Sequence, residues 1–160
     1  MTIQAGDRLP ETTLNKIGDG VEIVDTRSLF DGKKVVLFAV PGAFTPTCSE
    51  RHLPGFVERF EDFRAKGIDV ACVSVNDPFV MQAWGQSQNV PDGLLMLADG
   101  NGEFTRALGL EMDASAYGMG TRSKRFALYA EDGVVKQLHV EAPGEFRVSS
   151  ADYVLEHLPS

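Results

Sequence analysis

Short apolar runs between turn residues predict the β-strands of this chain. Residues 35–40 (VVLFAV) are apolar throughout, and residues 68–75 (IDVACVSV) are nearly so. Runs of this length and character are typical of strands that are buried on both faces of a sheet. Residues 94–98 predict a third such strand, and Gly20–Asp25 predicts a short strand nearer the N-terminus.

Apolar residues spaced three and four apart predict helices between these strands. In residues 49–66 they share one helical face, with Pro54 expected to kink or restart the helix and Gly67 to end it. Residues 79–88 follow the sequence Asn-Asp-Pro, which is typical of a helix start. Shorter helices are predicted at Thr26–Phe30, at Glu103–Leu108 and, with a serine cap, at residues 149–158.

A β-hairpin near the C-terminus completes the pattern. Residues 125–130 and Val134–Val140 flank an Asp-Gly pair, which favours a tight turn between two strands. Strands that alternate with helices predict parallel strands with helices on both faces of the sheet. We therefore predict an α/β protein with a thioredoxin-like fold, a central mixed β-sheet, and a single domain over residues 1–160.

Charge and composition exclude several classes of partner. The formal net charge is −8, with 23 acidic against 15 basic side chains, so neither nucleic acid nor an anionic membrane surface is an expected partner. No apolar run is long enough to span a bilayer. The first residues lack a basic stretch followed by an apolar one, and we expect a cytoplasmic protein without a secretory signal.

Metal sites and cofactors are not expected either. The three histidines are scattered and lack the spacing of zinc ligands. Residues 99–102 (DGNG) resemble the start of a calcium loop, but Phe104 stands where that loop needs glycine, so we predict a turn. Two cysteines are too few for a disulfide framework and are more typical of a catalytic or a buried thiol.

The candidate chemistry lies in residues 41–48 (PGAFTPTC), between the first central strand and the long helix. Cys48 is predicted in the first helical turn, where free backbone N–H groups stabilise a thiolate. Thr45 lies one turn earlier, and its hydroxyl can bond to the thiolate, to an incoming oxygen, or cap the helix. Pro41 is rigid and can cover one side of a pocket. The alternative for Cys48 is a buried thiol without chemistry.

The pattern P-x-x-x-T-x-x-C, formed by Pro41, Thr45 and Cys48, resembles the active-site motif of peroxiredoxins. The run PGAFTPTCSERHLPGF is similar to the type II, or peroxiredoxin-5, subfamily, and the likeness continues through SVNDPF, LAD and GTRSKRF. The resemblance implies a peroxidatic Cys48 that becomes a sulfenic acid, a Thr45 that bonds the peroxide, and a pocket residue Pro41. It also implies that Arg125 faces the thiolate, that no cofactor is used, and that the protein is a homodimer.

Several neighbours of these residues have alternative interpretations. Arg122 and Lys124 lie close to Arg125, and we interpret them as solvated surface cations or interface ion pairs. His52, four residues after Cys48, is expected to pack rather than to react. Phe44 and Phe79 belong either to the dimer interface or to the core.

Three rival functions and one open step remain. A thiol–disulfide oxidoreductase needs a C-x-x-C pair, but Thr45 stands where the first cysteine would be. A non-catalytic binding module or a redox sensor would keep the same fold. Recycling of a hydroperoxide-oxidised Cys48 is expected to use glutathione, glutaredoxin or thioredoxin, because Cys72 lies within a predicted buried strand. A Cys48–Cys72 disulfide is the alternative.

Overall fold

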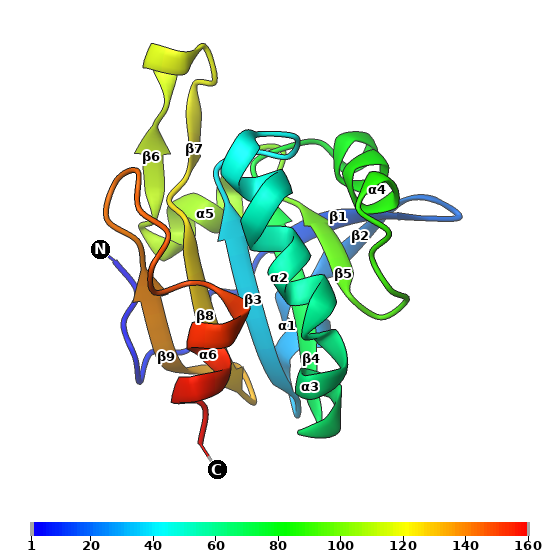
Figure 1. Ribbon diagram of the computed structural model, residues 1–160, viewed down its shortest axis with the longest axis vertical. Coiled ribbons are helices and arrows are strands. Elements are labelled where there is room, and N and C mark those ends of the chain that lie inside the picture. The colour runs from blue at the N-terminus through cyan, green and yellow to red at the C-terminus, as the bar shows by residue number, and fades with distance from the viewer. Residues whose placement is uncertain (1, 160) are drawn as a thin grey trace.

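The centre of the protein is a seven-stranded mixed sheet, seen in a computed structural model that describes residues 2–159 (Figure 1). Its strands lie in the order β2-β1-β5-β4-β3-β8-β9. Strands β3, β4 and β5 are parallel, and the other pairs are antiparallel. The strands are β1 (Thr13–Gly18), β2 (Gly20–Asp25), β3 (Lys34–Val40), β4 (Ile68–Ser74), β5 (Leu95–Ala98), β8 (Phe126–Glu131) and β9 (Val134–Val140).

Helices cover both faces of this sheet, which confirms the predicted α/β architecture. They are α1 (Thr26–Phe30), α2 (Leu53–Glu58), α3 (Phe60–Ala65), α4 (Pro78–Ser87), α5 (Glu103–Leu108) and α6 (Ala151–His157). A π-helical turn, η1 (Cys48–His52), precedes α2, and a short 3-10 turn, η2 (Ser115–Tyr117), lies further along. Within residues 2–159, no helix combines the length and the apolar character that crossing a membrane requires.

The central strand β3 feeds two separate cores because its side chains alternate between the faces of the sheet. Val36 and Phe38 pack with residues of α2, α3, α4 and α6. Val35 and Leu37 pack on the opposite face with residues of α1 and α5. All four side chains are buried, so the unbroken apolar run in the sequence reflects a strand covered on both sides.

Local capping signals in the sequence are confirmed. The Asp77 carboxylate accepts a hydrogen bond from the Val80 N–H at 2.9 Å and starts α4. Ser150 caps α6 through the N–H of Tyr153. Asp132 and Gly133 both have positive φ angles, as the tight turn between β8 and β9 requires.

The predicted helix over residues 49–66 restarts at Pro54, as expected, and is interrupted a second time further on. Pro54 lies in the first turn of α2, where a missing N–H costs little. The preceding π turn ends with the Leu53 N–H bonded to the Cys48 carbonyl, and α2 begins at Leu53. The second interruption lies at Arg59, whose side chain pairs with Asp152 of α6 at 2.9 Å. The chain leaves α3 after Ala65, close to the expected Gly67.

Three strands were missing from the sequence prediction. Strand β1 is inserted between β2 and β5, and it joins β5 through the single pair Asn15 and Ala98. Strands β6 (Glu111–Asp113) and β7 (Thr121–Ser123) form a separate hairpin. In Figure 1 this hairpin projects beyond the main sheet at the end where β3 finishes. It therefore lies at the end of the sheet that carries Cys48.

Candidate active site

Cys48 lies in the first helical turn after the carboxyl end of β3, as predicted. Its side chain is fully buried (0% exposed) and belongs to the core that also contains Phe38 and Leu53. The turn that begins at Cys48 is π-helical: the Leu53 N–H bonds to the carbonyl five residues earlier, whereas an α-helix bonds to the carbonyl four residues earlier. Such turns are rare and occur frequently at functional sites.

The loop before Cys48 is held between two neighbouring segments. A Cβ atom on Gly42 would lie 2.8 Å from Met119 Cε and 3.1 Å from Arg122 Nη1, so a larger residue here would displace the ends of these two side chains of the β6–β7 hairpin. On the other side, the Ala43 N–H donates to Asn76 Oδ1 at 2.9 Å. The loop therefore keeps one position relative to the strand ends.

Thr45 is partly buried in this loop, and its hydroxyl donates to the Gly42 carbonyl at 2.7 Å. Within residues 2–159 this is the hydrogen bond that the hydroxyl makes, and none joins it to the sulfur of Cys48. Because its hydrogen is used, the hydroxyl presents lone pairs that can accept a hydrogen bond from a ligand. Pro41 lies at the end of β3, also partly buried.

Arg125 reaches Cys48 from the segment before β8. Its Nη2 atom donates to Cys48 Sγ at 3.1 Å, although 77 residues separate them in the sequence. Its Nη1 atom lies 2.8 Å from Nδ1 of His52. A guanidinium is always charged and has a rigid set of donors, so it can hold a sulfur anion and orient an oxygen ligand.

His52 fixes the other side of this guanidinium. Its Nε2 atom lies 2.9 Å from the Ser149 carbonyl oxygen, which can only accept, so we assign the ring hydrogen to Nε2. Nδ1 is then the acceptor for Arg125. Burial, and then the charge of Arg125, lower the pKa of His52 from 6.5 to about 3, and the bond to Ser149 offsets only part of this. The ring is neutral at physiological pH.

Comparison with known proteins identifies this arrangement. The redoxin family profile matches residues 4–155. A rice relative, Peroxiredoxin-2E-2, chloroplastic, is 54% identical over 98% of this chain and 73% of its own length. Arabidopsis thaliana Peroxiredoxin-2B is 49% identical over 98% of each chain. The chain belongs to the type II peroxiredoxins. A crystal structure of reduced Prx3 from Vibrio vulnificus in complex with hydrogen peroxide matches this peroxiredoxin with a TM-score of 0.93 and 53% identity, covering 97% and 98% of the two chains.

Membership of this family makes the protein a thiol peroxidase with an antioxidant function. It also confirms the thioredoxin-like fold that the sequence predicted. The structure brings Cys48 and Arg125 into direct contact, with Thr45 on the loop that leads to the cysteine. Their individual roles in the peroxiredoxin remain predictions.

For Arg122 the structure excludes one of the two predicted alternatives, the solvated surface cation, and the prediction for His52 was incomplete. Arg122 is half-buried rather than solvated, and it donates to the carbonyls of Met119 and Pro41 at 2.9 and 3.5 Å. It braces the loop of the peroxiredoxin, whereas Lys124 is exposed as expected. His52 packs against Phe56 as predicted, but its bonds to Arg125 and Ser149 were missed. Its place one helical turn after Cys48 was the available signal.

Cys72, the second thiol of the peroxiredoxin, lies inside β4 and is fully buried. Burial, and then proximity to Cys48, raise the pKa of Cys72 well above the ordinary value for a thiol. Both cysteines are free in this structure. Cys72 is therefore protonated at neutral pH and a poor nucleophile.

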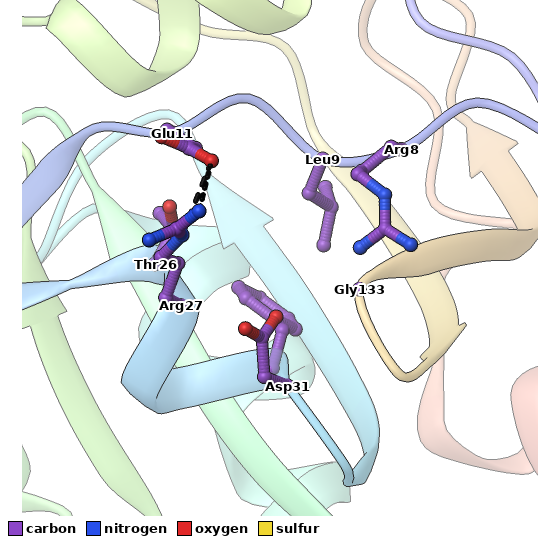
Figure 2. A pocket seen from close by; sticks show the side chains of 8 residues that line it. Arg8, Leu9, Glu11, Thr26, Arg27, Asp31 and Gly133 are labelled. Carbon is purple, nitrogen blue, oxygen red and sulfur yellow. Dashed lines mark hydrogen bonds and ion pairs between the residues drawn. The ribbon is translucent and has the colours of Figure 1, made fainter.

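A cavity lies at the opposite end of the sheet from Cys48, before β3 begins. It has a volume of about 190 Å³ and is lined partly by Arg8, Arg27, Asp31 and Gly133 (Figure 2). In Figure 2 the guanidinium of Arg27 is paired with Glu11, at 3.0 Å. No thiol lines this cavity, so the chemistry of the peroxiredoxin belongs to the Cys48 end.

The predicted turn at residues 99–102 is confirmed. The Gly102 N–H bonds to the Asp99 carbonyl at 2.9 Å, and the Asp99 carboxylate accepts bonds from Phe104 and Thr105 at the start of α5. Among residues 2–159 no group of three or more histidine, cysteine or acidic side chains is placed to hold a metal ion. The side chain of Asp99 thus serves the fold of this segment.

Proposed function

We propose that Cys48 is the nucleophile and that Arg125, Thr45 and Pro41 form its peroxide pocket. The observation that carries this proposal is the 3.1 Å contact between Arg125 Nη2 and the buried sulfur of Cys48. A charged donor beside the sulfur favours the thiolate, which is the reactive form of cysteine. The crystal structure of the Vibrio vulnificus relative in complex with hydrogen peroxide supports hydroperoxides as substrates.

The proposed reaction is a displacement on oxygen. The Cys48 thiolate attacks the terminal oxygen of ROOH, a sulfur–oxygen bond forms, and the O–O bond breaks. The electron pair leaves with RO⁻, which takes a proton from water to give an alcohol, or water when R is hydrogen. Cys48 becomes a sulfenic acid. Thr45 accepts a hydrogen bond from the peroxide O–H, and Arg125 stabilises the charge that develops on the leaving oxygen.

Substitution of Cys48 by serine tests this assignment. A serine hydroxyl stays protonated at neutral pH and is the weaker nucleophile, so peroxide consumption should fall below a few per cent of the wild-type rate. Cys72→Ser is the matched control, because it removes the other thiol of the same core. Substantial turnover by Cys48→Ser would overturn the assignment of the nucleophile.

We also propose that an external thiol recycles the enzyme, with glutathione or glutaredoxin favoured over thioredoxin. The protonated, buried Cys72 supports a cycle in which Cys48 works alone. Cys48 is itself fully buried, so the first helical turn must open before a thiol reaches the sulfenic acid. The cytoplasm, whose glutathione pool keeps thiols reduced, is the location we propose.

Turnover with each reductant separately distinguishes the alternatives. With glutathione and glutaredoxin, Cys72→Ser should keep most of the wild-type activity. Mass spectrometry of the peroxide-treated protein with glutathione should show an adduct on Cys48. A stoichiometric Cys48–Cys72 disulfide, together with loss of turnover in Cys72→Ser, would contradict the one-cysteine cycle.

We propose that the enzyme is a homodimer assembled near its active sites. Phe44 and Phe79 are 56% and 64% exposed, which excludes the core role considered from the sequence and suits an interface. The hydrogen bond from Ala43 to Asn76 ties the loop that carries Phe44 to the segment that leads into α4, where Phe79 lies. Sedimentation should show a dimer at tens of micromolar protein, and Phe79→Glu should weaken it. A monomer in wild-type protein would refute this assembly.

A further inference from the structure

The carboxylate of Glu141 is buried beside the active site but contacts neither Cys48 nor Arg125. Glu141 follows β9, and its side chain is 7% exposed. It accepts hydrogen bonds from the backbone N–H groups of Arg147, Val148 and Ser149, each at 2.8 Å. The Ser149 hydroxyl adds a fourth bond at 2.7 Å. Three successive N–H groups and a hydroxyl thus converge on one carboxylate, which is a cradle of the kind that binds anions.

These bonds hold residues 147–149 in place against the end of β9. Burial alone would raise the pKa of the Glu141 carboxyl, but the bonds from Ser149, Arg147 and Val148 lower it below its ordinary value. The side chain is therefore an anion at neutral pH. A negative charge strengthens each hydrogen bond that it accepts, so it holds residues 147–149 more firmly than a neutral acceptor would.

The segment held by Glu141 contacts the groups that orient Arg125. The Ser149 carbonyl accepts the hydrogen of His52 Nε2 at 2.9 Å, and His52 Nδ1 accepts from Arg125 Nη1 at 2.8 Å. The ring of Phe146, in the same segment, lies 5.0 Å from the His52 ring and 5.8 Å from the Arg125 guanidinium carbon. The path ends at the 3.1 Å contact between Arg125 and the sulfur.

The backbone of Glu141 closes this path into a ring. Its N–H donates to the carbonyl oxygen of Arg125 at 2.9 Å, so one residue contacts both the main chain of Arg125 and the loop that fixes its head group. Arg125 forms no ion pair with a carboxylate among residues 2–159. Apart from the sulfur of Cys48, the side chain that bonds to its guanidinium is the neutral His52, which must itself be held in place.

We propose that Glu141 is a positioning residue of the peroxidase reaction, acting on Cys48 through Ser149, His52 and Arg125. This inference rests on the proposed role of Arg125. The carboxylate holds the Ser149 carbonyl, this carbonyl selects the Nε2–H form of His52, and the free Nδ1 atom aims the guanidinium at the sulfur.

A double-mutant cycle between Glu141 and Arg125 tests the proposal. Glu141→Gln keeps the shape but directs an NH₂ group at backbone N–H donors. Substitutions along such a network change coupling by roughly 2- to 30-fold, and we expect a loss of about tenfold in kcat/KM for hydrogen peroxide. In an Arg125→Ala background the same substitution should change the rate by less than about twofold, because the group it acts through is gone.

The controls separate positioning from general destabilisation. Glu145→Gln removes an exposed carboxylate from the same loop and should leave the rate unchanged. The ultraviolet absorbance of the Cys48 thiolate at pH 7, measured in a Cys72→Ser background, should fall in Glu141→Gln. If Glu141→Gln does not fold, Ser149→Ala, which deletes only one bond to the carboxylate, should give a smaller loss that also disappears in Arg125→Ala.

The outcomes distinguish the two proposals. Equal losses from Glu141→Gln with and without Arg125 would make Glu141 a purely structural residue and overturn this inference. Full activity in Glu141→Gln, with a strong loss in Arg125→Ala, would overturn it while leaving the proposed role of Arg125 intact. Full activity in Arg125→Ala would refute the proposed role of Arg125 itself.

Discussion

Protonation of His52 should destabilise the folded enzyme in mildly acidic solution. In the unfolded chain the ring titrates near its ordinary pKa of 6.5, whereas burial and then Arg125 lower its pKa to about 3 in the fold. Between these values the unfolded state binds a proton that the folded state does not. The free energy of unfolding therefore rises with pH in this window. The contribution of His52 is fully present above pH 6.5 and is lost as the pH falls towards 3.

The size of the effect follows from the width of that window. One pKa unit corresponds to about 1.4 kcal/mol, so a drop from pH 7 to pH 4.5 should cost about 3 kcal/mol from His52 alone. That is a large part of the 5–15 kcal/mol that stabilises a typical domain. His139, whose pKa is lowered by burial and then by His157, acts in the same direction. The stability that the ionised Glu141 contributes is present above its ordinary pKa of 4.5 and is lost only below it, outside this pH range.

Urea unfolding of the wild type and of His52→Gln isolates the contribution. Glutamine offers a donor and an acceptor but does not titrate, and the single tryptophan, Trp84, reports unfolding because it is buried. When the pH falls from 7 to 4.5, the free energy of unfolding of the variant should decrease by about 3 kcal/mol less than that of the wild type, whatever the stability of the variant at pH 7. Parallel pH profiles for the two proteins would refute the buried, neutral His52.

Three further predictions concern the site itself. Arg125→Ala should lower kcat/KM for hydrogen peroxide by roughly 10²–10³, as loss of an oxyanion donor does, whereas Lys124→Ala, at an exposed neighbouring cation, should not. Thr45→Val, which deletes the hydroxyl at constant shape, should reduce peroxide turnover by roughly tenfold without slowing alkylation of Cys48. Fluorescence of Trp84, whose indole N–H donates to Ser49 at 2.9 Å, should change when peroxide converts Cys48 and the turn opens, and stay constant in Cys48→Ser.

The elements that the sequence predicted are those with strong local patterns. Strand β3 is buried on both faces, so all its residues except the first are apolar and its pattern is unmistakable. The turn at Asp132 and Gly133 needs two positive φ angles, which few residue pairs accept. In each case the determinant lies within a few adjacent residues, where a single sequence can reveal it.

The elements that were missed lack such a pattern. Only Leu14 is buried in β1, because this strand joins the sheet near its edge, so its sequence TLNKIG shows little apolar character. Strands β6 and β7 have three residues each, too few for a periodicity to appear. The interruption at Arg59 coincides with a tertiary contact to Asp152, 93 residues away, which no local pattern shows.

In the active site, too, the features with a local sequence pattern were predicted, and those set by long-range contacts were missed. Pro41, Thr45 and Cys48 lie within eight residues, and their place after a buried strand predicted a helix start that suits a reactive thiol, with a buried inert thiol as the alternative. The bond between His52 and Ser149 joins positions 97 residues apart, and no local feature of either residue indicates the other. Arg125 was predicted only through resemblance to a family, because its neighbours Arg122 and Lys124 offer the same charge.

The neutral histidine beside Arg125 explains how a partly buried cation can serve the sulfur of Cys48. A carboxylate at the position of His52 would also orient the guanidinium, but it would compete with Cys48 for the positive charge, and at these distances the competition would be strong. His52 provides one acceptor without a charge, since Ser149 holds its hydrogen on the far nitrogen. The negative charge that organises this side of the site is placed on Glu141, where backbone N–H groups neutralise it. Orientation and charge are thereby supplied by different residues, which leaves the field of Arg125 directed at the sulfur.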